Sequence, residues 1–206
     1  MKEKISESFI QTIYPKILYY GTPVLLLTTL NEDNSTNISP MSSSWALGYS
    51  IVLGMSSTSK AYENICRHQE CVINLPDSSL WTNVEKIALL TGKKPIPSFK
   101  EEMGFQFEKD KFGVSGLTPT LSNLVSPMRI QECPIQMEAK VVDIRSLKQT
   151  PSLVAVETEV VHVHVHSDII LRDNYIDPSK WSPLIYNFRH YFGLGEELGK
   201  TSRSET

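Results

Sequence analysis

The feature that most constrains the fold is a pair of long Val-rich segments in the second half of the chain. Residues Glu132–Ile144 and Leu153–Ser167 follow one another with no helical pattern between them. Val and other β-branched residues are typical of strands, and two strands joined by a short connection pair antiparallel. A doubly wound parallel sheet needs a helix between nearly all of its strands. The pair therefore favours a mainly β fold.

The first half adds further strands. The apolar run Thr22–Leu30 predicts a buried strand, and the polar residues from Asn31 predict a turn that returns the chain into Asn37–Ser44. Tyr49–Ser56 and Cys71–Pro76 are two more strand candidates. The order of these segments suggests a small closed or partly closed barrel of antiparallel strands with inserted helices.

Two helices and one long excursion are expected between the strands. Apolar residues recur at helical spacing over Lys60–His68, behind a Ser/Thr cluster, and over Ser79–Thr91, before Gly92. Lys93–Leu117 has weak periodicity and is expected to be an excursion, which in a compact domain is often functional. We expect Ile169–Asp177 to pair back on the last long strand.

Composition narrows the class of protein. The 206 residues contain no internal repeat or linker, so we expect one domain over 1–206, with a core at 14–195 and a flexible tail at 196–206. The net charge of −3 and the scattered Lys and Arg argue against a nucleic-acid partner. The longest apolar run is too short to span a bilayer, the charged N-terminus is unlike a signal peptide, and three cysteines form no CxxC pair. We therefore expect a cytoplasmic protein without a membrane segment.

Hydroxyl residues gather where a strand runs into the first expected helix. The N–H groups at a helix N-terminus and the helix dipole favour an anion, to which hydroxyls add donors and lysine adds charge. The candidate phosphate-binding residues are Ser56, Ser57, Thr58, Ser59 and Lys60. The alternative is a helix N-cap that is merely rich in hydroxyls.

A second polar cluster lies at the end of the strand that begins at Asn37. A proline that interrupts strand pairing exposes donors and acceptors beside an apolar wall, which suits the polar edge of a flavin ring. The candidate ring-binding residues are Asn37, Ser39, Pro40, Met41, Ser42 and Ser43. A polar turn without a ligand is the alternative.

The two clusters together resemble a known family. An N-x-S-P-x-S segment at Asn37–Ser42 precedes an S-x-x-x-K segment at Ser56–Lys60 and the strand Cys71–Pro76. Further on, Glu132–Val141 and Asp177–Gly195 resemble a strand and the closing segment of the same family. In this order, from about Tyr14 to Gly195, the chain resembles the flavin reductase-like FMN-binding split barrels. It is most similar to proteins labelled as reductase components of nitrilotriacetate-type two-component monooxygenases.

The resemblance implies a six-stranded Greek-key split β-barrel that forms a homodimer. It implies an FMN with its phosphate at Ser56–Lys60 and its ring beside Asn37–Ser43, approached by Arg189 and Tyr191. It also implies NAD(P)H as a transient reductant and a monooxygenase as a possible partner. Many members have Thr two residues after the lysine, where this chain has Tyr62, so no phosphate contact is assigned there.

Alternating histidines in the last long strand are a further candidate site. His162, His164 and His166 share one strand face, and the outer two lie roughly 13 Å apart, too far to share one ion. Two neighbours could bind a metal, but no third ligand can be assigned from the sequence. We favour a polar face lining the cofactor or an interface, with His162 or His164 near the flavin.

The resulting hypothesis is an NAD(P)H:FMN oxidoreductase that passes electrons to free flavin, a monooxygenase or another acceptor. The cofactor carries the redox chemistry, so no side chain is assigned as catalytic. Two alternatives remain: a non-catalytic flavin-binding or sensing protein, and a metal-dependent barrel that uses the histidine strand.

Overall fold

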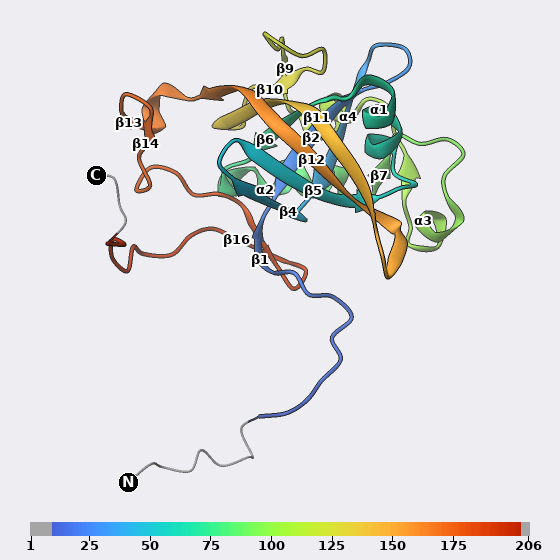
Figure 1. Cartoon of the computed structure of the whole chain (residues 1–206), viewed down its shortest axis with the longest axis horizontal. Coiled ribbons are helices and arrows are strands. Elements are labelled where there is room, and N and C mark those ends of the chain that lie inside the picture. The colour runs from blue at the N-terminus through green and yellow to red at the C-terminus, as the bar shows by residue number, and fades with distance from the viewer. Residues whose placement is uncertain (1–9, 203–206) are drawn as a thin grey trace.

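The computed structural model describes residues 10–202, and its main element is one curled antiparallel sheet (Figure 1). The sheet has seven strands, which lie in the order β3 (Thr36–Met41), β2 (Leu25–Leu30), β6 (Glu70–Leu75), β11 (Ile135–Leu147), β12 (Thr150–Val165), β5 (Ser50–Ser56), β4 (Ser44–Leu47). The expected mainly β split barrel is confirmed. The sheet has seven strands rather than the expected six.

The chain connection at Ser42 and Ser43 shows why the sheet curls. Strands β3 and β4 lie at opposite edges of the sheet, yet only these two residues separate them in the chain. The edges must therefore approach one another. The backbone N–H of Gly54 in β5 donates to the Ser43 carbonyl over 2.7 Å, and a Cβ on Gly54 would lie 3.1 Å from the Ser43 Cβ. The small residue permits this close corner.

Strand β2 is buried on both faces, which explains its unbroken apolar sequence. Leu25 and Leu27 join one apolar cluster with α1 (Lys60–His68), whereas Val24 and Leu26 join a second cluster with α2 (Trp81–Ala88). The helices therefore cover different faces of the sheet.

The predicted helix bounds hold for α1 but not for the second helix. Helix α1 begins after Ser59, whose hydroxyl accepts a hydrogen bond from the Tyr62 N–H. The expected Ser79–Thr91 helix is shorter: a 3₁₀ turn precedes α2, and Leu90–Thr91 forms strand β7. Residues 90 and 91 extend because β7 pairs with β8 in the excursion, an interaction distant in sequence.

The excursion that follows is built from short elements. They are α3 (Ser98–Glu102), β8 (Gln106–Phe107) and α4 (Lys111–Ser115). The chain then continues into β9 (Pro119–Thr120) and β10 (Arg129–Ile130). Leu117 and Ile130 are buried in the same cluster as α2, so this part of the chain contributes to the core as well as to the surface.

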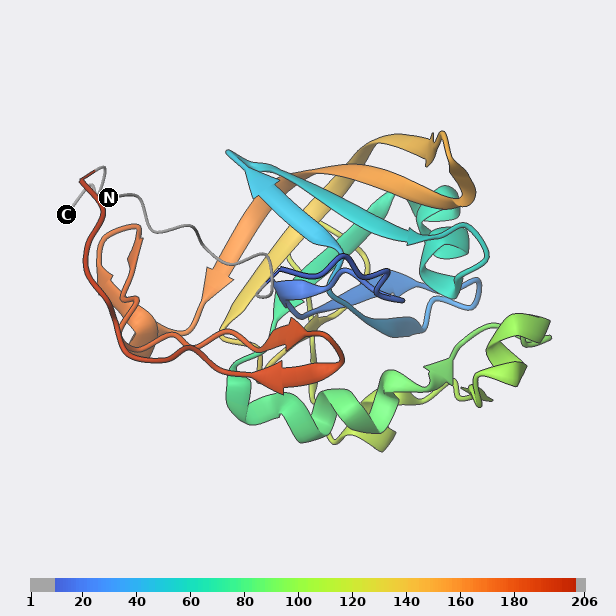
Figure 2. The same ribbon diagram turned by 90° about the horizontal axis from the view of Figure 1, so that it is seen from below.

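The C-terminal part lies against α2 and the start of the chain. Strands β15 (Ile185–Asn187) and β16 (His190–Phe192) form a small sheet with β1 (Tyr20–Pro23). Figure 2 shows β15 and β16 in red beside the green helix α2. In the chain between β12 and β15, strand β13 (Ile170–Arg172) pairs with β14 (Tyr175–Ile176). The expectation that Ile169–Asp177 pairs with the preceding strand was wrong, because its two short strands pair with one another instead.

No helix within residues 10–202 is long and apolar enough to cross a membrane. Residues 1–9 and 203–206 lie outside the described part of the chain, and so does the end of the expected C-terminal tail.

Candidate functional site

A cavity of about 640 Å³ lies where the barrel corner meets α1, α2, the excursion and the C-terminal sheet. Ser42, Ser43 and Gly54 contribute the corner, and Lys60 and Ala61 contribute the first turn of α1. The volume falls in the range typical of small-molecule sites, about 300 to 1,000 Å³. The cavity is therefore the candidate site.

Most of the residues proposed from the sequence line this cavity. They are Ser39, Pro40, Met41, Ser42, Ser43, Ser56, Ser59, Lys60 and Tyr191. Asn37 is not part of the lining but lies just behind it, since a Cβ on the lining residue Gly92 would be 2.6 Å from the Asn37 Oδ1. Ser57, Thr58, His162, His164 and Arg189 do not reach the cavity.

The hydroxyls before α1 largely bond to one another and to the backbone. The Ser56 and Thr58 hydroxyls are 2.9 Å apart, and Ser57 donates to the Ser152 carbonyl over 3.2 Å. Ser59 caps α1 through its hydroxyl. These bonds shape the turn and leave the Ser56 and Ser59 side chains on the cavity wall beside the first helical N–H groups.

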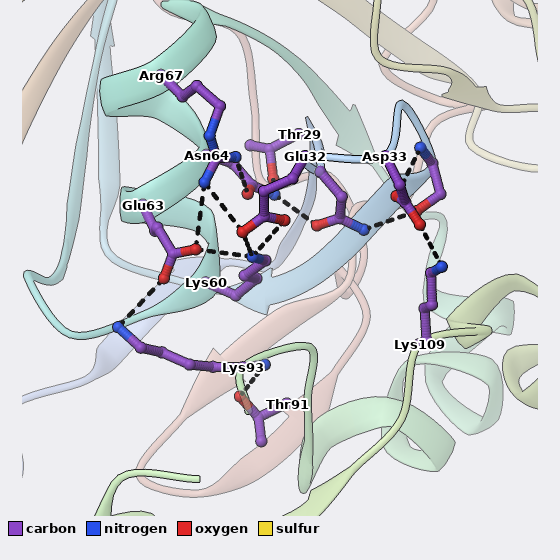
Figure 3. A network of polar contacts seen from close by, with 12 residues as sticks. Thr29, Glu32, Asp33, Lys60, Glu63, Asn64, Arg67, Thr91, Lys93 and Lys109 are labelled. Atoms are coloured by element: carbon purple, nitrogen blue, oxygen red, sulfur yellow. Dashed lines mark hydrogen bonds and ion pairs between the residues drawn. The ribbon is translucent and has the colours of Figure 1, made fainter. Parts of the chain in front are cut away.

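Lys60 is neutralised by two carboxylates (Figure 3). Its Nζ lies 2.7 and 2.8 Å from the two carboxylate oxygens of Glu32 and 2.8 Å from Glu63. Burial alone favours a lower pKa for Lys60, but the bonds to both carboxylates outweigh it and raise the pKa. The hydrogen bond from Lys60 lowers the pKa of Glu32 to about 2. Lys60 is charged, but little of its charge is left for a ligand.

Lys111 is the clearest residue that sequence reasoning missed. It begins α4, is only 2% exposed, lines the cavity, and donates from its Nζ to the Ile38 carbonyl over 2.7 Å. Burial, and then the charge of Lys100, lower the pKa of Lys111 to about 7. A lysine among Lys, Glu and Asp residues gives no sign in the sequence that the chain buries it.

A second lysine of the excursion, Lys100, also lines the cavity. It lies half-buried on α3, and burial and the charge of Lys93 lower its pKa. None of the described residues that line the cavity is Asp or Glu. The lining is therefore cationic, which favours an anionic ligand.

Tyrosines from both ends of the chain form another part of the wall. Tyr19 shares a hydrogen bond of 3.0 Å with Ser43, and its ring centroid is 5.6 Å from that of Tyr186. The ring of Tyr186 is in turn 5.7 Å from that of Tyr191, whose hydroxyl donates to Glu85 over 3.0 Å. Apolar residues of α2 and the excursion extend this surface, which suits a flat aromatic ligand.

The histidines of β12 lie outside the cavity, and one of them contacts a buried carboxylate. The His164 Nε2 lies 2.6 Å from the carboxylate of Glu138, which is fully buried and also accepts the N–H groups of Asn123 and Leu124. The ring centroids of His162 and His164 are 4.5 Å apart, with the ring planes tilted by 55°. In residues 10–202 no three His, Cys, Asp or Glu side chains are arranged to hold a metal ion. In this structure the Glu138 carboxylate holds the loop before β10 through the N–H groups of Asn123 and Leu124, and His164 contacts the same carboxylate.

Comparison with known proteins places the chain in a family. Residues 17–195 match the family model of the flavin reductase like domain. The chain is 60% identical over 194 residues to YdfE, an uncharacterized protein of Bacillus subtilis (strain 168), which covers 94% of each chain.

Two solved structures share the fold. Flavoredoxin of Desulfovibrio vulgaris (Miyazaki F) is similar with a TM-score of 0.77 at 21% identity, covering 96% of this chain and 100% of that one. Nitrilotriacetate monooxygenase component B from Bacillus cereus is similar with a TM-score of 0.73 at 17% identity, covering 93% and 98%.

Proposed function

Because the chain belongs to the flavin reductase-like family, a family of flavin-related oxidoreductases, we propose that it is an NAD(P)H-dependent FMN oxidoreductase. The observation that carries the proposal is the 640 Å³ cavity, which combines cations and hydroxyls with an aromatic wall and has no carboxylate among its described lining residues. FMN has the matching parts: an anionic phosphate and a flat, largely apolar ring.

The phosphate is proposed to lie between α1 and α4. At α1 it accepts hydrogen bonds from the first backbone N–H groups and from Ser56 and Ser59. The positive charge that balances the phosphate is proposed to come mainly from Lys111, because Glu32 and Glu63 already neutralise Lys60. This assignment moves the charged part of the predicted phosphate site from Lys60 toward the excursion.

The ring is proposed to lie along the barrel corner. Ser39, Ser42 and Ser43 offer donors and acceptors to its polar edge, and Tyr186 and Tyr191 pack against its apolar part. When bound, FMN would supply the redox chemistry, with the nicotinamide as the hydride donor. The protein holds the ring in place, excludes water from the buried side and leaves the cavity mouth open to the reductant.

The remaining parts of the proposal concern the protein's surroundings. We propose a cytoplasmic homodimer that delivers electrons to free flavin or to a partner such as a monooxygenase. Cys66, Cys71 and Cys133 are all unpaired in the described structure, which fits a reducing compartment.

Two measurements on purified protein test the function. Titration with FMN is expected to give a saturable change in the flavin absorption bands, and NADH or NADPH is then expected to be oxidised steadily in the presence of FMN. Saturable binding without oxidation of either nucleotide would identify a non-catalytic flavin-binding protein. Absence of FMN binding would overturn the site itself.

A further inference from the structure

The lysines around the cavity differ in how their charges are compensated. Lys60 contacts Glu32 and Glu63, and Lys93 lies 3.3 Å from Glu63. Lys111 is deeply buried and bonds to a backbone carbonyl, and among the described residues it has no carboxylate partner. Lys100 is the fourth, and among the described residues it makes no ion pair with a carboxylate.

Lys100 is placed to meet a ligand at the rim of the cavity. Helix α3 carries it between Phe99 and Met103, which also line the cavity, and its Nζ lies 5.2 Å from the centre of the Phe105 ring. A half-buried cation without a counter-ion, beside two other lysines, costs free energy that an anion would recover. The aromatic ring offsets only part of that cost.

The two lysines differ in how a ligand could reach them. Lys111 lies deep beneath β3, whereas Lys100 is only partly buried on a helix of the excursion. A group that reaches Lys100 enters from solvent. Lys100 is therefore a cationic contact available to a second anionic ligand that enters after the flavin.

We propose that Lys100 binds a phosphate group of the dinucleotide reductant as that reductant lies over the flavin. The inference rests on the proposed function, because it assumes that the cavity holds FMN. Two phosphates share the required chemistry: the pyrophosphate, present in NADH and NADPH alike, and the 2′-phosphate, present in NADPH alone. The apolar neighbours Phe99 and Met103 would pack against the sugar or base beside it.

The experiment compares FMN-loaded wild type, Lys100→Ala and Lys100→Arg. Each is mixed anaerobically with NADH or NADPH over a range of concentrations, and the Kd of the nucleotide is taken from the saturation of flavin reduction. Titration with NAD⁺ and NADP⁺, followed by the flavin absorption, measures binding without reduction. Lys94→Ala is the matched control, since Lys94 lies 5.2 Å over the Phe107 ring in the same excursion but does not line the cavity.

The expected result is that Lys100→Ala raises the nucleotide Kd about tenfold, that Lys100→Arg largely restores it, and that Lys94→Ala leaves it unchanged. Equal losses for both nucleotides identify the pyrophosphate, and a loss for NADPH alone identifies the 2′-phosphate. The affinity for FMN is expected to stay the same in all variants.

Two results would overturn the inference. The first is a tenfold loss of FMN affinity in Lys100→Ala, which would assign Lys100 to the flavin phosphate. The second is an unchanged Kd for both nucleotides, or wild type that binds neither. If wild type binds the nucleotides but is not reduced by them, the proposed function fails while the binding arm still decides the role of Lys100.

Discussion

At the scale of single residues, Lys111 is expected to lower the stability of the ligand-free protein and to strengthen its proposed binding of FMN. It occupies the lining of the cavity, yet it is almost completely removed from water and bonds to the Ile38 carbonyl. A buried lysine is costly in the ligand-free protein, and a phosphate beside it reverses that cost.

Lys111→Met is expected to weaken FMN binding roughly tenfold to a hundredfold, the value of a charge-assisted hydrogen bond. Riboflavin, which lacks the phosphate, is expected to bind both forms alike. Fluorescence titration with the two ligands measures the difference. Equal losses for both would show that Lys111 supports the ring site or the local fold instead.

The pKa of Lys111 also predicts how the stability of the ligand-free protein depends on pH. Burial lowers this pKa to about 7 in the folded state, while the unfolded chain keeps the ordinary value of 10.5. Between these values the unfolded chain binds more protons than the folded one, so the free energy of unfolding rises with pH. Below about pH 7 both states are protonated and the penalty is complete.

Urea unfolding from pH 6.5 to 9.5 checks this. The gain in stability of Lys111→Met over wild type is expected to be largest at the acid end and to shrink as the pH rises. A gain that is constant over the range would mean that the Lys111 pKa is the same in both states.

At the scale of elements, ion pairs join two points of the excursion to α1 and to the β2–β3 turn. Lys93 pairs with Glu63 of α1, and Lys109 pairs with Asp33 in the β2–β3 turn (Figure 3). The Lys109 and Asp33 side chains are 58% and 49% exposed, and those of Lys93 and Glu63 are 29% and 33% exposed. Ion pairs that solvent reaches in this way stabilise the fold only weakly. Their effect is therefore local.

The double variant Lys93→Gln/Lys109→Gln is expected to leave the urea midpoint nearly unchanged but to speed proteolytic cleavage between 94 and 108. The loss of two anchors lets this segment open without unfolding the barrel. Lys148→Gln, in the distant turn between β11 and β12, is the control. Unchanged cleavage would show that apolar contacts alone hold the excursion.

The excursion is also the part of the candidate site that could not be predicted from the sequence. The strands, α1 and both hydroxyl clusters were predictable because apolar spacing and capping residues are local signals. Lys100 and Lys111 were not predicted, since their burial depends on how a segment without periodicity folds back on the barrel. His162 and His164 sat on the predicted strand face, but that face contacts Glu138 rather than the cavity.

At the scale of the whole molecule, the β4–β5 hairpin presents a surface unsuited to water. Trp45, Leu47 and Tyr49 are 59%, 75% and 74% exposed. Strand β4 is also an edge of the sheet, with backbone groups free to pair. Such a surface beside the cavity corner supports the proposed homodimer.

Sedimentation at micromolar concentration is expected to show a dimer with FMN present. Leu47→Glu is expected to shift it to a monomer, because the partner would have to bury an unpaired charge. The distant surface variant Leu198→Glu is the control. A wild-type monomer would contradict the proposal.

The corner at Ser42 and Ser43 has a consequence for the order in which the protein folds. The corner residues are neighbours in the chain, but the turn before α1 is fixed by Ser57 and Ser152, which are 95 residues apart. Long-range pairings of this kind form slowly. We therefore expect the wall of the cavity to be complete only when β12 has met the turn after β5, so that a folding chain gains the proposed affinity for flavin late. Binding of flavin would then distinguish fully folded molecules from partly folded ones.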